Sequence, residues 1–152
     1  MNIVLELNEF NENNIFLNKP VPNTVIENSN FCRVTYSNHL FSLNGVNLKI
    51  FIETESKERF YNKYKCSFNV SKNQNIINEL AQIETNILRR TNFKNKNPVF
   101  KIKKQLECGN IKLFSDLSET KMSNNYIIKL SGVWVTETEY GITYKFVDLV
   151  DH

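Results

Sequence analysis

Hydrophobic and polar residues alternate along much of this chain, and a period of two residues is typical of β-strands that bury one face. The clearest alternation predicts strands at residues 46–53, 59–70, 126–136 and 141–150. Shorter apolar runs indicate further strands at residues 3–7, 31–36, 39–43, 99–106 and 111–114. The Asn44-Gly45 pair predicts a hairpin turn between residues 39–43 and 46–53, because both residue types accept the positive φ angles of a type I′ turn.

One segment has a helical period instead. Its apolar residues recur at the spacing of a single helical face: Ile76, Leu80, Ile83 and Ile87. Upstream, Ser71 and Gln74 can form a capping box, and downstream Arg89 and Arg90 suit the negative end of the helix dipole. We therefore predict one helix between two sets of strands, followed by an inserted hairpin at residues 99–114.

The order of these elements constrains the fold class. Strands and helices do not alternate regularly, which argues against a parallel α/β fold. We predict a mainly β protein, an OB-like antiparallel barrel with one helix and an inserted hairpin. An α+β sandwich with one covering helix is the alternative. Residues 1–152 have the length of a single domain, in which residues 1–30 are expected to form an N-terminal strand and an arm.

The net charge of +3 conceals an uneven distribution of charge along the chain. Residues 57–112 contain 13 Lys and Arg against four Glu, so the remainder is net acidic. Between Glu84 and Glu107 there is no acidic residue, and the stretch combines cations with aromatic rings: Arg89, Arg90, Phe93, Lys94, Lys96, Phe100, Lys101, Lys103 and Lys104. Cations neutralise phosphates and flat rings stack on unpaired bases, so this stretch is a candidate nucleic-acid site. A solvated, lysine-rich loop would have the same composition.

A second candidate cluster lies on the polar face of the predicted middle strands. Its members are Lys49, Phe51, Arg59, Phe60, Tyr61, Lys63 and Lys65. An exposed phenylalanine among lysines gains little unless an apolar and anionic ligand, such as a nucleotide, covers it. The alternative is that Phe51 packs under the N-terminal arm and the lysines are solvated. Trp134, Tyr144 and Phe146 share the parity of apolar neighbours and are predicted to lie in the core, whereas Tyr140 is expected to be exposed at a turn.

Residues for catalysis or metal binding are sparse. His39 and His152 are the only histidines, and no phosphate-binding, dinucleotide-binding or nucleophile-elbow motif occurs. Two pairs of carboxylates could hold Mg²⁺ in a nuclease, although such pairs more often face solvent: Glu53 with Glu55 and Glu137 with Glu139. The three cysteines lack a C-x-x-C spacing, which indicates free thiols in a reducing compartment. We therefore expect a non-enzymatic protein without cofactor or metal.

The sequence also bears on the compartment. The N-terminal residues are acidic and do not form the charged-then-apolar pattern of a signal peptide. No apolar stretch reaches the length that spans a bilayer, so no membrane association is expected. These features predict a cytoplasmic protein.

Residues 126–147, YIIKLSGVWVTETEYGITYKFV, combine an apolar strand, a polar turn and an aromatic strand. This pattern resembles the C-terminal hairpin of OB-fold single-stranded DNA-binding proteins of large cytoplasmic DNA viruses and of cytoplasmic linear plasmids, over about a seventh of the chain. The resemblance implies sequence-tolerant coating of single strands during replication. Expected partners are then single-stranded DNA, or RNA, together with a second copy of the chain and replication proteins. A structural or assembly protein with a basic partner-binding patch, and a metal-dependent nuclease, are the alternatives.

Overall fold

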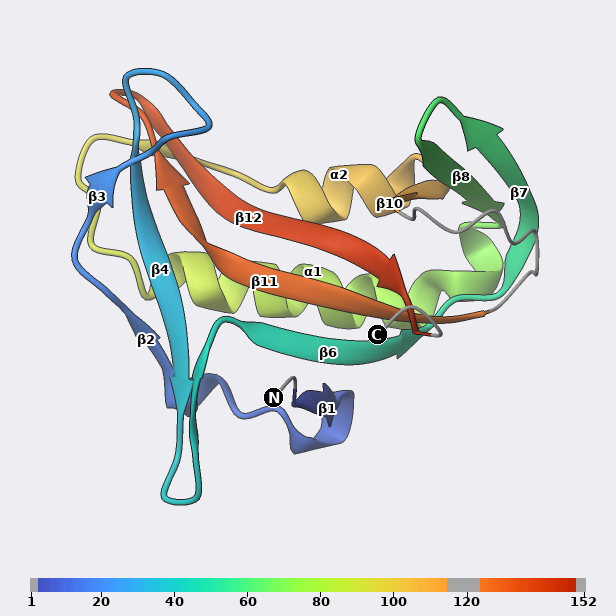
Figure 1. Cartoon of the computed structure of the whole chain (residues 1–152), viewed down its shortest axis with the longest axis horizontal. Coiled ribbons are helices and arrows are strands. Elements are labelled where there is room, and N and C mark those ends of the chain that lie inside the picture. The colour runs from blue at the N-terminus through green and yellow to red at the C-terminus, as the bar shows by residue number, and fades with distance from the viewer. Residues whose placement is uncertain (1–2, 115–123, 150–152) are drawn as a thin grey trace.

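The computed structural model describes residues 3–114 and 124–149. In these residues the protein is mainly β, with one long helix, α1 (Gln74–Arg89), and one short helix, α2 (Lys101–Glu107) (Figure 1). The strands are β1 (Val4–Glu6), β2 (Ile15–Leu17), β3 (Val21–Pro22), β4 (Asn30–Ser37), β5 (Ser42–Asn44), β6 (Val46–Phe51), β7 (Thr54–Phe60), β8 (Lys63–Phe68), β9 (Asn97–Val99), β10 (Asn110–Phe114), β11 (Asn125–Val135) and β12 (Glu139–Asp148). Short 3-10 turns are η1 (Leu7–Glu9), η2 (Glu12–Asn14) and η3 (Ser71–Asn73).

The β11–β12 hairpin forms the centre of the sheet, and the sequence predicted it correctly. The main strand order is β1-β6-β11-β12-β10-β8-β7, and β4 pairs with the second half of β11. Three pairs are parallel, β1 with β6 and both β9 and β10 with β12, so the sheet is mixed. Within the described residues the end strands β1 and β7 do not pair with each other. The sheet is therefore open, and the closed antiparallel barrel is not confirmed.

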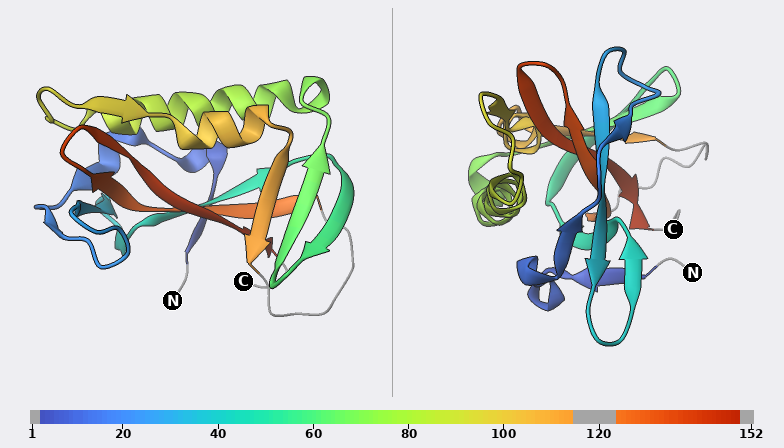
Figure 2. Two further views of the ribbon diagram at one scale, coloured as in Figure 1. Left: turned by 90° about the horizontal axis from the view of Figure 1, so that it is seen from above. Right: turned by 90° about the vertical axis from the view of Figure 1, so that its left-hand side faces the viewer.

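The molecule has a helical layer and a curved sheet. Both helices lie on one side of β11 and β12, as the two views of Figure 2 show, and among the described residues none forms a helix on the opposite side of the hairpin. The left view also shows β10, β8 and β7 running across the direction of β12. A buried ion pair accompanies this bend: Lys57 Nζ of β7 lies 3.6 Å from Asp148 Oδ2 of β12, and 4.8 Å from the ring centre of Tyr64. The end strand β7 is thereby tied to the central hairpin.

The long helix confirms the helical period of the sequence. Of the predicted face, Leu80 and Ile87 are buried, whereas Ile76 and Ile83 are only partly buried; the remaining buried apolar residues are Ile77 and Leu88. The same face carries Glu84, which is fully buried and was not predicted as a core residue. Its two carboxylate oxygens accept the backbone N–H groups of Ile102 (2.8 Å) and Lys103 (3.0 Å), which are among the unpaired donors at the start of α2. Burial raises the pKa of Glu84, and the two hydrogen bonds oppose that rise. Glu84 therefore fixes α2 against α1.

The predicted capping box does not form. The N-cap of α1 is Asn73, and its side chain makes no capping bond. Asn73 instead donates to the carbonyl oxygens of Glu53 and Asn69 and accepts the N–H of Glu53. The start of the helix is thus bound to the chain between β6 and β7, rather than capped by Ser71 and Gln74.

The inserted hairpin at residues 99–114 was predicted wrongly, because its first arm is helix α2. Lys101, Ile102 and Lys103 alternate like a strand over three residues. Ile102 and Leu106, however, are four residues apart, which is the spacing of one helical face, and both are buried. Only the second arm, β10, is a strand, and it pairs with β8 and β12.

The hairpin across Asn44-Gly45 was also predicted wrongly. Strand β5 pairs with β4, and the turn between them lies at residues 38–41. Gly45 does adopt a positive φ of 79°, but it directs the chain from β5 into β6, which pairs with β1 and β11. A Cβ on Gly45 would lie 2.9 Å from the carbonyl oxygen of Leu130. Glycine is therefore required here by the close approach of β11.

The predicted strand at residues 59–70 is in fact the end of one strand and the whole of another. The chain turns at Tyr61, whose φ is 58°, so that β7 and β8 form a hairpin. Tyr61 is 83% exposed at the tip of that hairpin rather than on a strand face. The N-terminal arm contributes strands as well: β1 pairs with β6, and β2 and β3 pair with β4.

Candidate nucleic-acid interface

The face of the sheet that points away from the helices is rich in cations. Residues that pair directly across neighbouring strands share a face, so the strand register assigns each side chain to one side. Lys65 pairs with Lys112, and Lys129 pairs with Lys145. Their neighbours along each strand pack in the core or against it. We call this surface the outer face; its cations are Arg33, Lys49, Lys63, Lys65, Lys112, Lys129 and Lys145.

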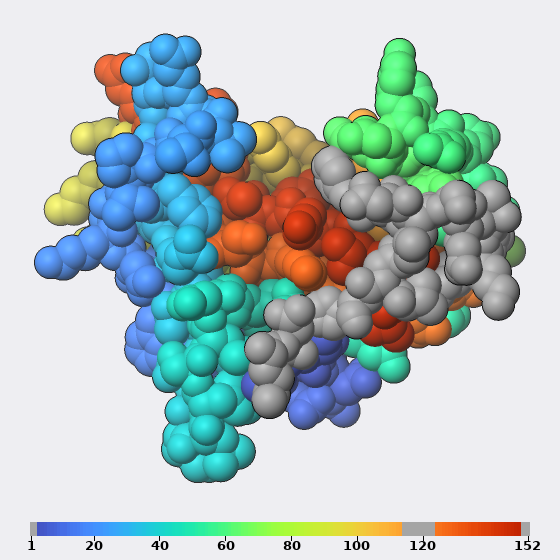
Figure 3. Space-filling view, in the orientation of Figure 1, coloured from blue at the N-terminus to red at the C-terminus, as the bar shows by residue number. Residues whose placement is uncertain are grey.

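Figure 3 shows this face, with β11 and β12 (orange and red) as its floor. The floor lies between the blue segment that precedes β4 and the green β7–β8 hairpin, so the face is concave. Two carboxylates also lie on the outer face, each directly across from a lysine of the neighbouring strand. Glu58 lies opposite Lys65, and Glu6 lies opposite Lys49, whose Nζ is 3.6 Å from the Glu6 carboxylate. Cations therefore outnumber carboxylates on these strand pairs.

A β-bulge sets the aromatic part of the floor. The register of β11 against β12 shifts between Leu130 and Gly132, so the side chains beyond the bulge change face. Trp134 therefore lies on the outer face, opposite Gly141. It is buried, 6% exposed, as the sequence predicted, but it packs on the side opposite to Leu130. The ammonium group of Lys101 lies 4.7 Å from the centre of the indole.

A hollow of about 510 Å³ adjoins this floor, between the β7–β8 hairpin, β10 and the end of α2. Its lining residues are Glu58, Phe60, Lys65, Gln105, Cys108, Asn110 and Lys112. A second hollow of about 250 Å³ is lined by Gln105, Lys112, Tyr144, Lys145 and Phe146. Because Gln105 and Lys112 line both, the two hollows are adjacent. Together they connect the β7–β8 hairpin with β12.

The structure divides the predicted strand cluster. Phe60, Lys63 and Lys65 lie on the outer face of β7 and β8, and Phe60 is 59% exposed. Lys49 and Phe51 are also on the outer face, but β11, β12 and β10 separate their strand β6 from β8. Arg59 and Tyr61 do not belong to this face. Arg59 pairs with the core residue Tyr64, and its Nε donates to the carbonyl oxygen of Tyr61 (3.4 Å).

Phe51 does not pack under the N-terminal arm, because it is 57% exposed. It borders a hollow of about 560 Å³ that is lined by Glu6, Leu7, Asn8, Lys49, Ile50, Asn75, Ile76 and Glu79. This hollow lies between the arm and the start of α1. It therefore combines an exposed ring with carboxylates as well as with Lys49.

The basic stretch around α2 belongs mostly to the helical layer. Arg89, Lys94, Lys103 and Lys104 are exposed, and Lys103 lies 3.9 Å from Glu107. The remaining members of the stretch have internal partners, with the exception that Lys101 reaches over Trp134 on the outer face. The structure thus separates most of this stretch from the sheet cations.

Those internal partners are specific. Arg90 Nη2 donates to Asn13 Oδ1 (2.9 Å), and Lys96 Nζ donates to the carbonyl oxygens of residues 136 and 137 at the β11–β12 turn (2.5 and 3.0 Å). The ring of Phe93 packs 5.2 Å from that of Tyr140, which is consequently half-buried rather than exposed. Phe100 packs against the core. Neither phenylalanine of this stretch therefore presents an open ring.

Four cations of the outer face were not selected from the sequence: Arg33, Lys112, Lys129 and Lys145. The local sequence pattern indicates the face of two of them, because Lys129 and Lys145 alternate with core residues in the two strands of the predicted hairpin. A pairing of β11 with β12 then places the two lysines opposite each other. Lys112 joins them only through the parallel pairing of β10 with β12, which the local pattern does not reveal.

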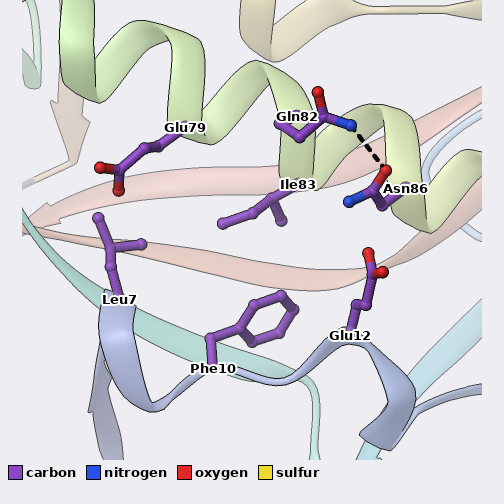
Figure 4. A pocket seen from close by; sticks show the side chains of 7 residues that line it. All are labelled: Leu7, Phe10, Glu12, Glu79, Gln82, Ile83 and Asn86. Atoms are coloured by element: carbon purple, nitrogen blue, oxygen red, sulfur yellow. Dashed lines mark hydrogen bonds between the residues drawn. The ribbon is translucent and has the colours of Figure 1, made fainter.

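A further hollow, of about 290 Å³, lies between the N-terminal arm and α1 (Figure 4). Leu7, Phe10 and Ile83 form its apolar part, and the carboxylates of Glu12 and Glu79 border it. No cation is among its described lining residues. This hollow is therefore poorly suited to a polyanion.

The described residues contain no group of three or more His, Cys, Asp or Glu that could hold a metal ion. Glu53 and Glu55 are exposed, as are Glu137 and Glu139, and His152 lies outside the described residues. In the described part of the chain, no helix is long and apolar enough to cross a membrane.

Comparisons with protein-family models, with curated proteins and with solved structures find no match for this chain. A functional proposal therefore rests on the residues and geometry of the chain itself.

Proposed function

We propose that this protein is a non-enzymatic single-stranded DNA-binding protein that binds through the outer face of its sheet. The observation that carries the proposal is the convergence of seven cations from six strands on one concave face. Exposed rings, Phe60 and Phe51, lie towards its two ends. Cations that neutralise phosphates, combined with rings that stack on bases, are the elements of sequence-tolerant single-strand binding.

The arrangement favours single strands over duplex. Reading a duplex in the major groove with a helix requires that the helix project from the protein. Helices α1 and α2 are packed in the opposite layer, and their buried faces hold the core. Exposed phenylalanines gain stacking energy only from bases that are not already stacked in a duplex.

In this proposal the protein is OB-like, with a curved β-sheet and one long helix that leave a sheet face open for the strand. The hairpin that resembles OB-fold single-stranded DNA-binding proteins corresponds to β11 and β12, which form the floor of the outer face. The corresponding role is the coating of single strands during replication of a virus or linear plasmid in the cytoplasm. Self-association and contacts with replication proteins belong to the same proposal.

The test is fluorescence anisotropy with labelled oligo-dT, oligo-rU and a duplex of equal length across a salt series. We expect oligo-dT to bind more tightly than duplex at every salt concentration, with an affinity that falls as salt rises. Equal or stronger binding of duplex contradicts the proposal. Poly-glutamate serves as a competitor. We expect it to displace oligo-dT only when it is present in high excess. Tighter binding of poly-glutamate than of oligo-dT would indicate an acidic protein partner instead.

A further inference from the structure

We infer that the hollow between the β7–β8 hairpin and the end of α2 seats one nucleotide of the bound strand. The base lies against Phe60, and the phosphate lies between Lys65 and Lys112. This inference rests on the proposed function and specifies where on the outer face a base is held. The hollow of about 510 Å³ is within the range of about 300–1,000 Å³ that is usual for small-molecule sites.

The ring of Phe60 is available for stacking. Phe60 is 59% exposed, and its side chain lines the hollow. Tyr61 meets it edge to face, with ring centres 4.8 Å apart and planes at 82°. This contact restrains the phenylalanine without placing a second ring parallel to it. A base can therefore supply the stacking partner that the protein does not provide.

The two lysines form a like-charge pair. Lys65 and Lys112 are directly opposite each other in the β8–β10 ladder, and like charges in this position destabilise a sheet. Neither forms an ion pair in the described part of the chain. Lys145 borders the adjacent hollow, which shares Lys112. An anionic group between these ammonium groups removes their repulsion, and a phosphate is the anion that accompanies a base.

The wall formed by α2 and the start of β10 is built from amides that hold each other in place. Gln105 Nε2 donates to the backbone oxygen of Asn110 (2.9 Å) and to its Oδ1 (2.8 Å). Asn110 Nδ2 donates to the carbonyl oxygen of Cys108 (3.4 Å). Helix α2 and strand β10 thus present fixed polar groups, so the hollow does not have to be ordered when a nucleotide enters.

Two other hollows of the described residues lack this combination. The hollow beside Phe51 contains two carboxylates, Glu6 and Glu79, and its single Lys49 is already paired with Glu6, whereas the hollow at Phe60 contains one carboxylate, Glu58, beside two lysines. The hollow of Figure 4 is bordered by carboxylates and by no described cation. Only the hollow at Phe60, among these three, offers an open ring together with two lysines that have no ion-pair partner among the described residues.

Cys108 provides a direct probe of this hollow. It is exposed and lines the hollow, whereas Cys32 and Cys66 are buried and their burial raises the pKa of both thiols. Thiolates are the reactive form, so N-ethylmaleimide should modify Cys108 first in the native protein. Saturating oligo-dT should slow the modification of Cys108. The two buried thiols serve as a control, because faster modification of Cys32 and Cys66 in the presence of oligo-dT would indicate unfolding.

Two variants complete the test, with circular dichroism to verify their fold. Phe60→Leu should weaken oligo-dT binding about 5- to 150-fold, the range for one stacked base. Lys112→Gln should lower the log–log salt slope by about 0.7, the value for one phosphate contact on a single strand. Both should reduce the protection of Cys108. Lys19→Gln, an exposed lysine before β3, removes the same charge away from the hollow and should leave the protection unchanged.

The outcomes separate this inference from the proposed function. Binding of oligo-dT with protection of Cys108 that both variants reduce supports the inference. Binding of oligo-dT without protection, or with unchanged binding by folded Phe60→Leu and Lys112→Gln, overturns the nucleotide seat and leaves single-strand binding intact. Absence of oligo-dT binding even at low salt overturns the proposed function itself.

Discussion

The location of the phosphate path can be decided by comparing two charge-matched sets of substitutions. The sheet set replaces Lys112, Lys129 and Lys145 by Gln. The helical set replaces three exposed cations of the basic stretch by Gln: Arg89, Lys94 and Lys103. Each variant loses three positive charges, so any effect of net charge alone is equal in both. Arg90, Lys96 and Lys101 stay unchanged because they hold Asn13, the β11–β12 turn and Trp134.

The expected magnitude follows from counterion release. Each lost phosphate contact lowers the log–log slope of affinity against salt by about 0.7 on a single strand, so three lost contacts lower it by about 2. We expect this decrease for the sheet set and a decrease well below one contact for the helical set. The reason is geometric, because the sheet lysines lie on one face across β10, β11 and β12, whereas the helical set lies in the opposite layer.

The assay is oligo-dT anisotropy over the salt series, with denaturation of each variant as a control for folding. The sheet variant should be at least as stable as the native protein. Lys129 and Lys145 are directly opposite each other, as are Lys65 and Lys112, and removing such repulsion stabilises a sheet by about 0.2–1 kcal/mol per pair. The outer face would be refuted as the binding site if the log–log salt slope fell by about 2 in the helical variant and stayed unchanged in a folded sheet variant.

Three further predictions concern the framework of the site. Trp134→Ala should lower the free energy of unfolding by about 3–5 kcal/mol, because the indole is buried; a variant that melts like the native protein but no longer binds oligo-dT would show that the indole stacks on bases instead. Gly141→Ala should cost about 1–3 kcal/mol in urea unfolding, since the added methyl would lie 2.7 Å from Trp134 Cζ2 and 2.9 Å from the oxygen of Val99; an unchanged midpoint would mean that the ring moves freely. Burial raises the pKa of Glu84, so the folded state binds its proton more tightly, and the free energy of unfolding should fall as pH rises from the ordinary value of 4.5 through the raised pKa. Glu84→Gln should remove this part of the pH dependence, and parallel pH profiles of the two proteins would contradict it.

The parts of the fold that could be predicted are the longest elements. Helix α1 repeats one helical pattern, and β11 and β12 are long enough to be recognised as strands although a bulge after Leu130 interrupts the alternation of β11. Short segments were predicted less well. Three alternating residues beginning at Lys101 looked like a strand, but the contact of Ile102 and Leu106 with the core selects a helix, and Glu84 supplies its first hydrogen bonds.

The site was harder to predict than the elements that form it. The alternation of side chains along β8 correctly predicted that Lys63 and Lys65 lie on the face opposite to that of the core residue Tyr64, because alternation is a local property of a strand. Which strands are neighbours is not local. Lys112 and Lys145 are brought together by a parallel pairing of strands that are separated in sequence, and the face of Trp134 is set by a bulge one residue long.

The outer face is costly to maintain, and this cost is itself informative. Two pairs of lysines, Lys65 with Lys112 and Lys129 with Lys145, are directly opposite each other, although a carboxylate or an amide at one position of each pair would stabilise the sheet. Positive charge that is concentrated on one face attracts a polyanion and accelerates encounter. A surface that gives up stability for concentrated positive charge is expected where an anion completes the structure, and the single strand that we propose as the ligand would supply phosphates along this face.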